Sequence, residues 1–318
     1  MSNNKENLVT KEIDETLSNK RLDVVLAEIF PEYSRSRLKK WLESNFVSVN
    51  EKVINKPSHK IIFPAKLKLS IPDTDLTEDL PEKIELNIIK STSEYIVIDK
   101  TAGMVVHPGA GNKSGTLLNA LLHEYPELKK LPRAGIVHRL DKDTSGLMVV
   151  ARNELAMQSL SEQISNRSIK RIYHAFVVGK IERSGRVDAP IGRHPKNRQK
   201  QAIVETGREA KSYYKVLENF GSYSHLEISL ETGRTHQIRV HMSHLGFPLI
   251  GDPLYGRRRR FAKNTRQKLR EIIESFPRQA LHAAELSFTD LSTDKEVTFK
   301  SKLPLDLVEL RENLLNQA

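Results

Sequence analysis

The sequence contains no cysteine. That absence excludes disulfide bonds, thiolate zinc sites, iron–sulfur clusters and a cysteine nucleophile. No apolar run approaches the roughly 20 residues that cross a bilayer, and the polar start MSNNKENLVTKE lacks the apolar stretch of a secretory signal. Tryptophan occurs once, and few aromatic residues cluster as they do in sugar sites. We therefore expect a cytoplasmic protein.

Negative charge is in short supply. The 318 residues include 51 Lys and Arg against 40 Asp and Glu, a formal net charge of +11. Such an excess favours a polyanionic partner, and nucleic acid is favoured over a membrane surface. A generally basic enzyme would also fit this composition, so charge alone leaves both classes open. The length suits one large domain and one small domain.

The small domain is predicted at residues 13–75, after a flexible tail over residues 1–12. Apolar residues at helical spacing predict a first helix that Pro31 ends; they are Leu22, Val25, Leu26 and Ile29. Ser34 is a suitable N-cap for a second helix, with an apolar side of Leu38, Trp41 and Leu42. FVSVNEKVI predicts a hairpin that turns at Asn50-Glu51, and AKLKLSIP predicts a further strand.

This unit resembles the S4 RNA-binding domain in the segments RLDVVLAEIF, SRSRLKKWLES and VSVNEKV. The resemblance implies an RNA-binding role for the basic side of the second helix, formed by Arg35, Arg37, Lys39 and Lys40. Ordinary solvated charge is the alternative. One departure concerns the turn, because Glu51 stands where such modules often have glycine. The acidic, proline-containing residues 76–86 then read as a linker.

The remaining residues, 87–318, are predicted to form a larger α+β domain. Short strand-like runs dominate: YIVIDK, GMVVHP, GLMVVA, YHAFVVG and HLEISLETG. Helical patterns are fewer: TLLNALLHEY, ELAMQSLSEQIS, TRQKLREIIESF and LDLVELRENLLNQ. This order predicts a mixed, mainly antiparallel central sheet flanked by helices and loops.

Ionisable residues crowd into GIVHRLDKDTSGLMVV, residues 135–150. GIVHRLD alternates and LMVVA reads as a buried strand, so KDTSG is predicted to turn between them. Asp141 could cap that turn by accepting hydrogen bonds from nearby backbone N–H groups. It could instead be a nucleophile kept ionised by Arg139 or by a distant arginine. The residues alone leave both roles open.

Other motifs fail on inspection. HPGAGNKSGT cannot be a P-loop, because Ser114 stands where the second glycine is required after Gly109. Arg139 and Lys142 would oppose a divalent cation beside Asp141, and HQIRVHMSH lacks the HExxH spacing. We expect neither a metal nor a cofactor. Asp141 and Asp143 could form the carboxylate pair of a glycoside or nucleoside hydrolase, which remains a rival interpretation.

HRLDKDTSG resembles the signature of the RluA-type pseudouridine synthases. The similarity continues through RIYHAFVVG, LETGRTHQIRVHMSHLGFPLIGDPLYG and RQALHAAELSF, and it covers the whole chain. GIVHRLDKDTSGLMVV and PIGRHP are most similar to the RluD-type branch, which acts on large-subunit ribosomal RNA. The resemblance implies an enzyme that converts uridine to pseudouridine in large-subunit (23S) ribosomal RNA. The sequence leaves the oligomeric state open, and we expect a monomer. A non-catalytic S4-type ribosome-assembly factor is the alternative.

The resemblance also assigns site residues. Asp141 would be the nucleophile, Tyr173 would stack near the uracil and could act as a base, and Arg239 would pair with Asp141. Substrate-binding residues would be Arg139, His138 and Leu281. Further RNA contacts are expected from two basic loops, at Arg193 and at Arg257, Arg258, Arg259 and Arg260.

The pattern around Arg239 agrees with that assignment. Thr235 is a suitable N-cap and Gly246 a suitable stop, so Arg239 would lie in the first turn of a helix. That end of a helix attracts an anion. Three reaction routes stay open for an extruded uridine: attack of Asp141 on C6 of the uracil, its attack on C1′ of the ribose, or removal of the C2′ proton by a base such as Tyr173.

Overall fold

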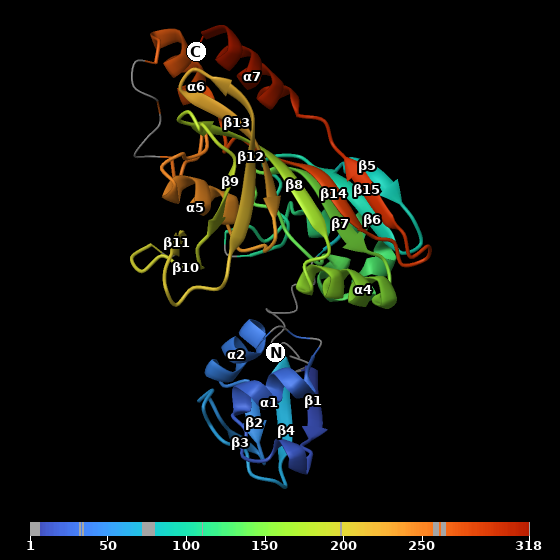
Figure 1. Ribbon diagram of the computed structural model, residues 1–318. Helices are drawn as coiled ribbons and strands as arrows, with labels where there is room; N and C mark the ends of the chain where they lie inside the picture. The colour runs from blue at the N-terminus through green and yellow to red at the C-terminus, as the bar shows by residue number, and fades with distance from the viewer. Residues whose placement is uncertain are drawn as a thin grey trace, which may run out of the picture. The chain divides into compact units, whose positions relative to one another are not determined.

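The structure is a computed structural model that describes residues 7–31, 33, 35–71, 80–109, 111–197, 199–256, 261 and 265–317. The chain forms two compact units, Met1–Leu80 and Pro81–Ala318, each with its own hydrophobic core (Figure 1). The predicted N-cap Ser34, the basic run 257–260, the start of the tail and part of the linker lie outside the described residues. Among those residues, every helix is too short or too polar to cross a bilayer.

Unit 1 packs two helices on a four-stranded antiparallel sheet. The helices are α1 (Leu22–Ile29) and α2 (Arg35–Glu43), preceded by the short helix η1 (Glu15–Leu17). The strands are β1 (Asn7–Glu12), β2 (Val47–Val49), β3 (Lys52–Val53) and β4 (Lys66–Ile71), in the order β1-β4-β2-β3. Residues 7–12, expected within a flexible tail, instead pair with β4 along six positions, because a distant edge supplies their hydrogen bonds.

The hairpin predicted at Asn50-Glu51 is present, and its turn shows how the missing glycine is tolerated. Both residues have positive φ, 47° and 66°, the pattern of a type I′ turn. The Asn50 side chain accepts a hydrogen bond from Lys66 N–H at 2.8 Å. Glu51 forms an ion pair with Lys68. These contacts to β4 hold a turn that glycine would enter more easily.

Unit 2 is built on a nine-stranded sheet in the order β5-β6-β7-β14-β8-β13-β12-β9, with β15 paired to β14. Within the described chain its strand pairs are antiparallel, except for β7 with β14. The strands are β5 (Ile88–Ser91), β6 (Tyr95–Lys100), β7 (Ser145–Ala151), β8 (Lys170–Val178), β9 (Gly185–Asp188), β12 (Lys211–Phe220), β13 (Tyr223–Leu230), β14 (Leu281–Thr289) and β15 (Glu296–Lys300). A separate hairpin joins β10 (Ile191–Arg193) to β11 (Gln201–Ile203).

Helices cover the sheet of unit 2. They are α3 (Leu117–Glu124), α4 (Glu154–Ser165), α5 (Gln237–His244), α6 (Gln267–Ser275) and α7 (Leu305–Gln317), with short helices η3 (Pro126–Lys130) and η4 (Pro132–Gly135). Residues of β7 alternate between two cores: Met148 and Val150 pack in the cluster that includes α3 and α5, whereas Leu147 and Val149 pack in the cluster that includes α4. Figure 1 shows α4 beside β7 and α6 beside α7. The predicted α+β class is confirmed.

Two predicted strands are wrong. GIVHRLD runs as a loop with one isolated bridge, between Ile136 and Val150, and GMVVHP forms one bridge, between Val105 and Thr116. Ile136 and Leu140 are buried, so the apolar positions of this segment reflect side-chain packing rather than strand pairing. Asp141 therefore lies on a loop and not at the end of a strand.

Candidate active site

The loop that carries Asp141 begins and ends at glycines that press against other backbone. Gly135 has φ 75°, and a Cβ there would lie 1.9 Å from the carbonyl oxygen of Ala151. Gly146 has φ 115°, and its Cβ would lie 2.3 Å from the carbonyl oxygen of Ala283 on β14. A side chain fits at neither position, so these close approaches fix where the loop leaves and rejoins the sheet.

Buried polar groups fix the loop between the glycines. The Lys100 ammonium donates to the carbonyls of Lys142 (2.9 Å), Thr101 (2.8 Å) and Met104 (3.0 Å). Burial lowers the pKa of Lys100 to about 8, although Asp143 and Asp141 oppose that shift. The predicted substrate-binding residue His138 accepts a hydrogen bond at Nε2 from Val149 N–H at 3.0 Å. Burial lowers its pKa to about 3, so its ring is neutral.

The Asp141 carboxylate is aimed at an arginine rather than at its own turn. Its Oδ2 accepts from Nη1 of Arg239 at 2.9 Å, and its Oδ1 lies 3.8 Å from Nε2 of His236. The turn is closed by backbone, with Thr144 N–H donating to the carbonyl of Asp141. The capping role left open by the sequence is therefore not the one adopted. Asp141 retains 20% exposure, against 5% for Arg239.

Arg239 is oriented by a second carboxylate, Asp252. Nε and Nη2 of Arg239 donate to the two oxygens of Asp252 at 2.7 and 3.0 Å. Asp252 also accepts from the N–H groups of Leu254 and Tyr255, both at 2.9 Å, and its side chain is fully buried. Burial alone would lower the pKa of Arg239, but Asp252 and Asp141 raise it. The fork of Arg239 is thus fixed, with Nη1 directed at Asp141.

Helix α5 places Arg239 in its first turn, as predicted, but the cap differs. The helix begins at Gln237, and the N-cap is His236 in the left-handed region at φ 57°, not Thr235. The Gln237 side chain, rather than a threonine hydroxyl, accepts from Arg234 N–H at 2.9 Å. The C-cap is Leu245, and Gly246 follows it with φ 82°, so Gly246 ends the helix as predicted.

The left-handed conformation of His236 directs its ring between Asp141 and Tyr255. The Tyr255 hydroxyl accepts from Gln201 N–H and lies 2.9 Å from Nδ1 of His236. The tautomer in which Nδ1 accepts the Tyr255 proton has its own ring proton on Nε2, on the side of Asp141. Burial lowers the pKa of His236 and favours the neutral ring.

A cavity of about 720 Å³ opens at Asp141. All six predicted catalytic and substrate-binding residues line it: Asp141, Tyr173, Arg239, Arg139, His138 and Leu281. Tyr173 lies on β8 opposite Ala283, and Leu281 starts β14. Burial raises the pKa of Tyr173, partly offset by Arg171, so its phenol is protonated at neutral pH.

Positive charge dominates the cavity wall. The lining arginines are Arg133, Arg139, Arg167, Arg171, Arg208, Arg234 and Arg239. The described carboxylates that line it are Asp141 and Glu231, and Glu231 is paired with Arg167 at 2.6 Å. Asp143 is absent from the described lining, which leaves the carboxylate pair of the hydrolase interpretation without support.

Comparison with known proteins decides the family. The model of the RNA pseudouridylate synthase family matches residues 94–244, and the S4 domain model matches residues 20–61. The ribosomal large subunit pseudouridine synthase D of Pseudomonas aeruginosa is 48% identical over 299 residues, which cover 94% of this chain and 93% of that protein. The chain belongs to the RNA pseudouridylate synthase family.

Other relatives of this pseudouridylate synthase agree. The ribosomal large subunit pseudouridine synthase D of Escherichia coli (strain K12) is 44% identical over 304 residues, 96% of this chain and 93% of that protein. Among solved structures, human RNA pseudouridylate synthase domain containing 4 has 25% identity and a TM-score of 0.57, covering 72% of this chain and 93% of that chain. Within the described residues, no three His, Asp or Glu side chains group as metal ligands.

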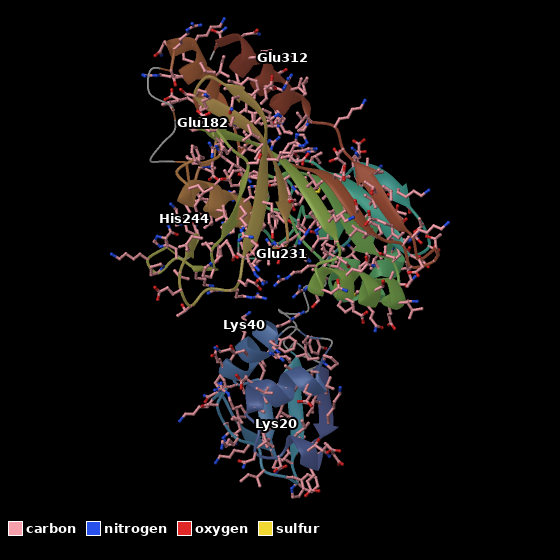
Figure 2. The ribbon with its side chains drawn as sticks, in the orientation of Figure 1. Lys20, Lys40, Glu182, Glu231, His244 and Glu312 are labelled. Carbon is pink, nitrogen blue, oxygen red and sulfur yellow. The ribbon has the colours of Figure 1, made fainter. Side chains whose placement is uncertain are left out.

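Among the described residues, those predicted to bind RNA outside the site do not line the cavity of the pseudouridylate synthase. Arg35, Arg37, Lys39 and Lys40 lie on α2 of unit 1, where Figure 2 labels Lys40. The Arg37 guanidinium lies over the Trp41 ring at 4.9 Å, and Lys39 pairs with Glu43 at 3.6 Å. Arg193 is exposed at the end of β10.

Sequence reasoning missed Asp252, His236 and Tyr255. Asp252 and Tyr255 stand in GDPLYG and His236 in GRTHQIR, segments that were quoted only for their overall similarity. The available signal was an aspartate and a tyrosine in a glycine-bounded turn close to a predicted arginine site. That signal gives no partner, because only the fold brings the turn after α5 beneath Arg239.

Proposed function

We propose that this pseudouridylate synthase isomerises uridine in large-subunit ribosomal RNA, with Asp141 as the nucleophile. The observation that carries the proposal is the ion pair of Asp141 with Arg239 at 2.9 Å, inside a cavity lined by arginines. The names of the relatives that match along nearly the whole chain supply the class of RNA.

The cavity fits a nucleotide taken out of its stack. Extrusion of a base costs a few kcal/mol, and contacts between arginines and phosphates offset that cost. Arg139 lies beside Asp141 in the loop and lines the cavity, so its side chain can fill the space that the uridine vacates. Leu281 and Tyr173 supply an apolar edge and an aromatic ring against the uracil.

Asp141 begins the reaction as a carboxylate whose negative charge is stabilised by Arg239. Asp252 fixes the orientation of Arg239, so Asp141 is held while its exposed edge faces the cavity. Attack by Asp141 forms a covalent bond to the nucleotide, and the bond from N1 to C1′ is cleaved. The uracil turns, the bond from C5 to C1′ forms, and the Asp141 carboxylate is released from the nucleotide. The C5 proton is then lost, and the proton count of the base is restored at N1.

The raised pKa of Tyr173 bears on the choice of route. A phenol that is protonated at neutral pH is a poor base for the C2′ proton. We therefore place the first step at Asp141 and give Tyr173 the role of packing against the uracil. Attack at C6 and attack at C1′ both use the same carboxylate.

The test uses ribosomal RNA transcripts that carry tritium at uridine C5, since isomerisation must expel that hydrogen. We expect Asp141→Asn to lose release at least ~1,000-fold, as loss of a nucleophile does, while RNA binding persists. Asp143→Asn is the matched control and keeps its release. Free uracil with a requirement for Asp143 would instead indicate a hydrolase. Tight binding without release by the wild type, on transcripts and on pre-ribosomal particles, would indicate an assembly factor.

Two finer expectations belong to the same proposal. We propose that the enzyme acts as a monomer. We also propose that it works in the cytoplasm, where ribosomal RNA is its partner. Sedimentation of the purified protein and fractionation of cells that express it test these two points.

A further inference from the structure

Arg171 stands out from the arginines around the cavity. It lies on β8 two residues before Tyr173, so both side chains project from the same side of the strand. It lines the cavity and is 8% exposed. Its Nε is buried and, among the described residues, has no hydrogen-bond partner. Within the part of the chain that the structure describes, no carboxylate oxygen lies within 4.0 Å of a guanidinium nitrogen of Arg171, the distance that defines an ion pair.

Other arginines of unit 2 show what is missing at Arg171. Arg239 contacts Asp141 and Asp252, and Arg278 contacts Asp306 with two nitrogens. Arg167 contacts Glu209 and Glu231. A buried guanidinium without a counter-ion destabilises the folded protein. Because Arg171 lies in the cavity wall, a ligand that enters the cavity could supply the missing anion.

A glycine makes the space that Arg171 occupies. A Cβ at Gly233 would lie 2.6 Å from Nη1 of Arg171 and 3.5 Å from the central guanidinium carbon. The φ of Gly233 lies outside the left-handed region, so its backbone conformation does not require glycine. The close atoms belong to the end of a flexible side chain, so a Cβ at Gly233 would displace the guanidinium of Arg171 rather than the backbone. Gly233 and Arg171 therefore form a seat that holds the fork in the cavity wall.

The surroundings of this seat repel cations and attract anions. Arg208 and Arg234 line the same cavity, and burial together with Arg208 and Arg167 lowers the pKa of Arg234. The charge of Arg171 likewise acts to lower the pKa of Tyr173 and the pKa of His138. Its charge therefore reaches the place where the uracil is proposed to lie. The planar fork matches phosphate oxygens better than a neutral base.

We infer that Arg171, seated against Gly233, is a subsite for one phosphate of the RNA next to the extruded uridine. The inference rests on the proposed function for its ligand. In this arrangement the ion pair of Arg171 is completed only when RNA binds. The subsite then couples entry of the backbone phosphate to placement of the base against Tyr173.

The first experiment measures binding of a large-subunit ribosomal RNA fragment at several salt concentrations. Loss of one phosphate contact reduces the slope of log K against log salt by about 0.7 for single-stranded RNA. We expect that reduction for Arg171→Gln and a nearly normal slope for Arg171→Lys. Arg152→Gln is the control, because Arg152 is paired with Glu127 and does not line the cavity. An unchanged slope for Arg171→Gln overturns the subsite.

A second experiment replaces single phosphates near the target uridine with neutral methylphosphonates. One position should weaken binding by the wild type roughly tenfold, the value of a charge-assisted contact, and leave binding by Arg171→Gln unchanged. Additive losses at every position would overturn the inference. These are binding measurements, so failure of tritium release by the wild type is read separately and counts against the isomerase proposal alone.

Thermal unfolding without RNA separates binding from a structural role. Removal of a buried unpaired charge should leave Arg171→Gln at least as stable as the wild type. A lower unfolding temperature would make Arg171 a structural residue and would overturn the subsite. Gly233→Ala should weaken RNA binding when it is introduced into the wild-type protein. It should have little further effect when it is introduced into Arg171→Gln, which lacks the guanidinium.

Discussion

At the scale of single residues, the site depends on how one guanidinium is shared between two carboxylates. Asp252 is fully buried and uses both oxygens on Arg239, whereas Asp141 is partly exposed and uses one. The buried partner fixes the geometry and the exposed partner faces the cavity. A guanidinium can serve both because its donors lie in one rigid plane.

Asp252→Asn should therefore harm both stability and catalysis. The amide cannot accept two charge-assisted bonds, so Arg239 would be buried with reduced compensation, at a cost of about 3 kcal/mol in the free energy of unfolding. Urea unfolding measures that loss, and tritium release measures the accompanying drop in rate. Lys170→Gln is the control, since its pair with Glu296 is exposed and worth less than about 1 kcal/mol. Equal losses in the two variants would contradict the role given to Asp252.

The sequence located the residues of the cavity better than it located their partners. Resemblance brought Asp141, Tyr173 and Arg239 into one hypothesis, and the structure places all three around one cavity. Whether Asp141 caps its turn could not be decided, because the deciding contact comes from a residue 98 positions away. Asp252 was missed for a similar reason, since its contact depends on the course of the chain after α5.

At the scale of elements, the loop between Gly135 and Gly146 is defined by two places where backbone meets backbone. The sequence indicated turn chemistry there, and it predicted the strand that follows. It also predicted a strand before the turn, because GIVHRLD was interpreted as an alternating segment. Alternation reports which side chains are buried, and it does not show whether the backbone has a partner strand.

Gly146→Ala should disrupt this loop far more than a glycine change in open space. Its Cβ would overlap the backbone of Ala283, so we expect a loss of roughly 3 kcal/mol or more in stability together with loss of tritium release. Gly103→Ala is the matched control: its φ is also positive, at 89°, but no atom lies within 4 Å of its added Cβ. About 1 kcal/mol is expected there. Similar losses at both positions would show that backbone conformation, not close approach, governs Gly146.

At the scale of the whole molecule, the chain is divided into two units with separate hydrophobic cores. From the sequence we predicted two domains, because the basic helix and hairpin of one end contrast with the strand-rich remainder; the structure divides the chain between Leu80 and Pro81. The sequence did not show that residues 7–12 belong to the first sheet, since their partner strand β4 lies more than 50 positions along the chain. Local patterns do not reveal pairings of that kind.

Buried neutral histidines should make unit 2 sensitive to acid. Burial lowers the pKa of His138 and of His225 to about 3, against about 6.5 in an unfolded chain. The folded state then binds fewer protons between these values, so stability is fully present above pH ~6.5 and is lost as pH falls. At pH 5 the loss is roughly 2 kcal/mol for each histidine.

Urea unfolding at pH 7 and pH 5 measures this loss. His225→Gln changes the free energy of unfolding at both pH values. It should reduce the difference between the two values by roughly 2 kcal/mol, the contribution expected from one histidine. A difference that is unchanged in His225→Gln would show that other groups bind the protons.

The position of β14 in the sheet has a consequence for how the protein is made. This strand, Leu281–Thr289, lies between β7 and β8. It supplies both the parallel partner of β7, the strand that follows the Asp141 loop, and part of the cavity wall. Unit 1 is complete by residue 80, and N-terminal domains fold first during synthesis. A nascent chain halted between these two points would therefore carry a folded S4 unit while its catalytic sheet lacked its central strand. During synthesis, the S4 unit would therefore fold before the catalytic sheet is complete, so binding of RNA could precede catalysis.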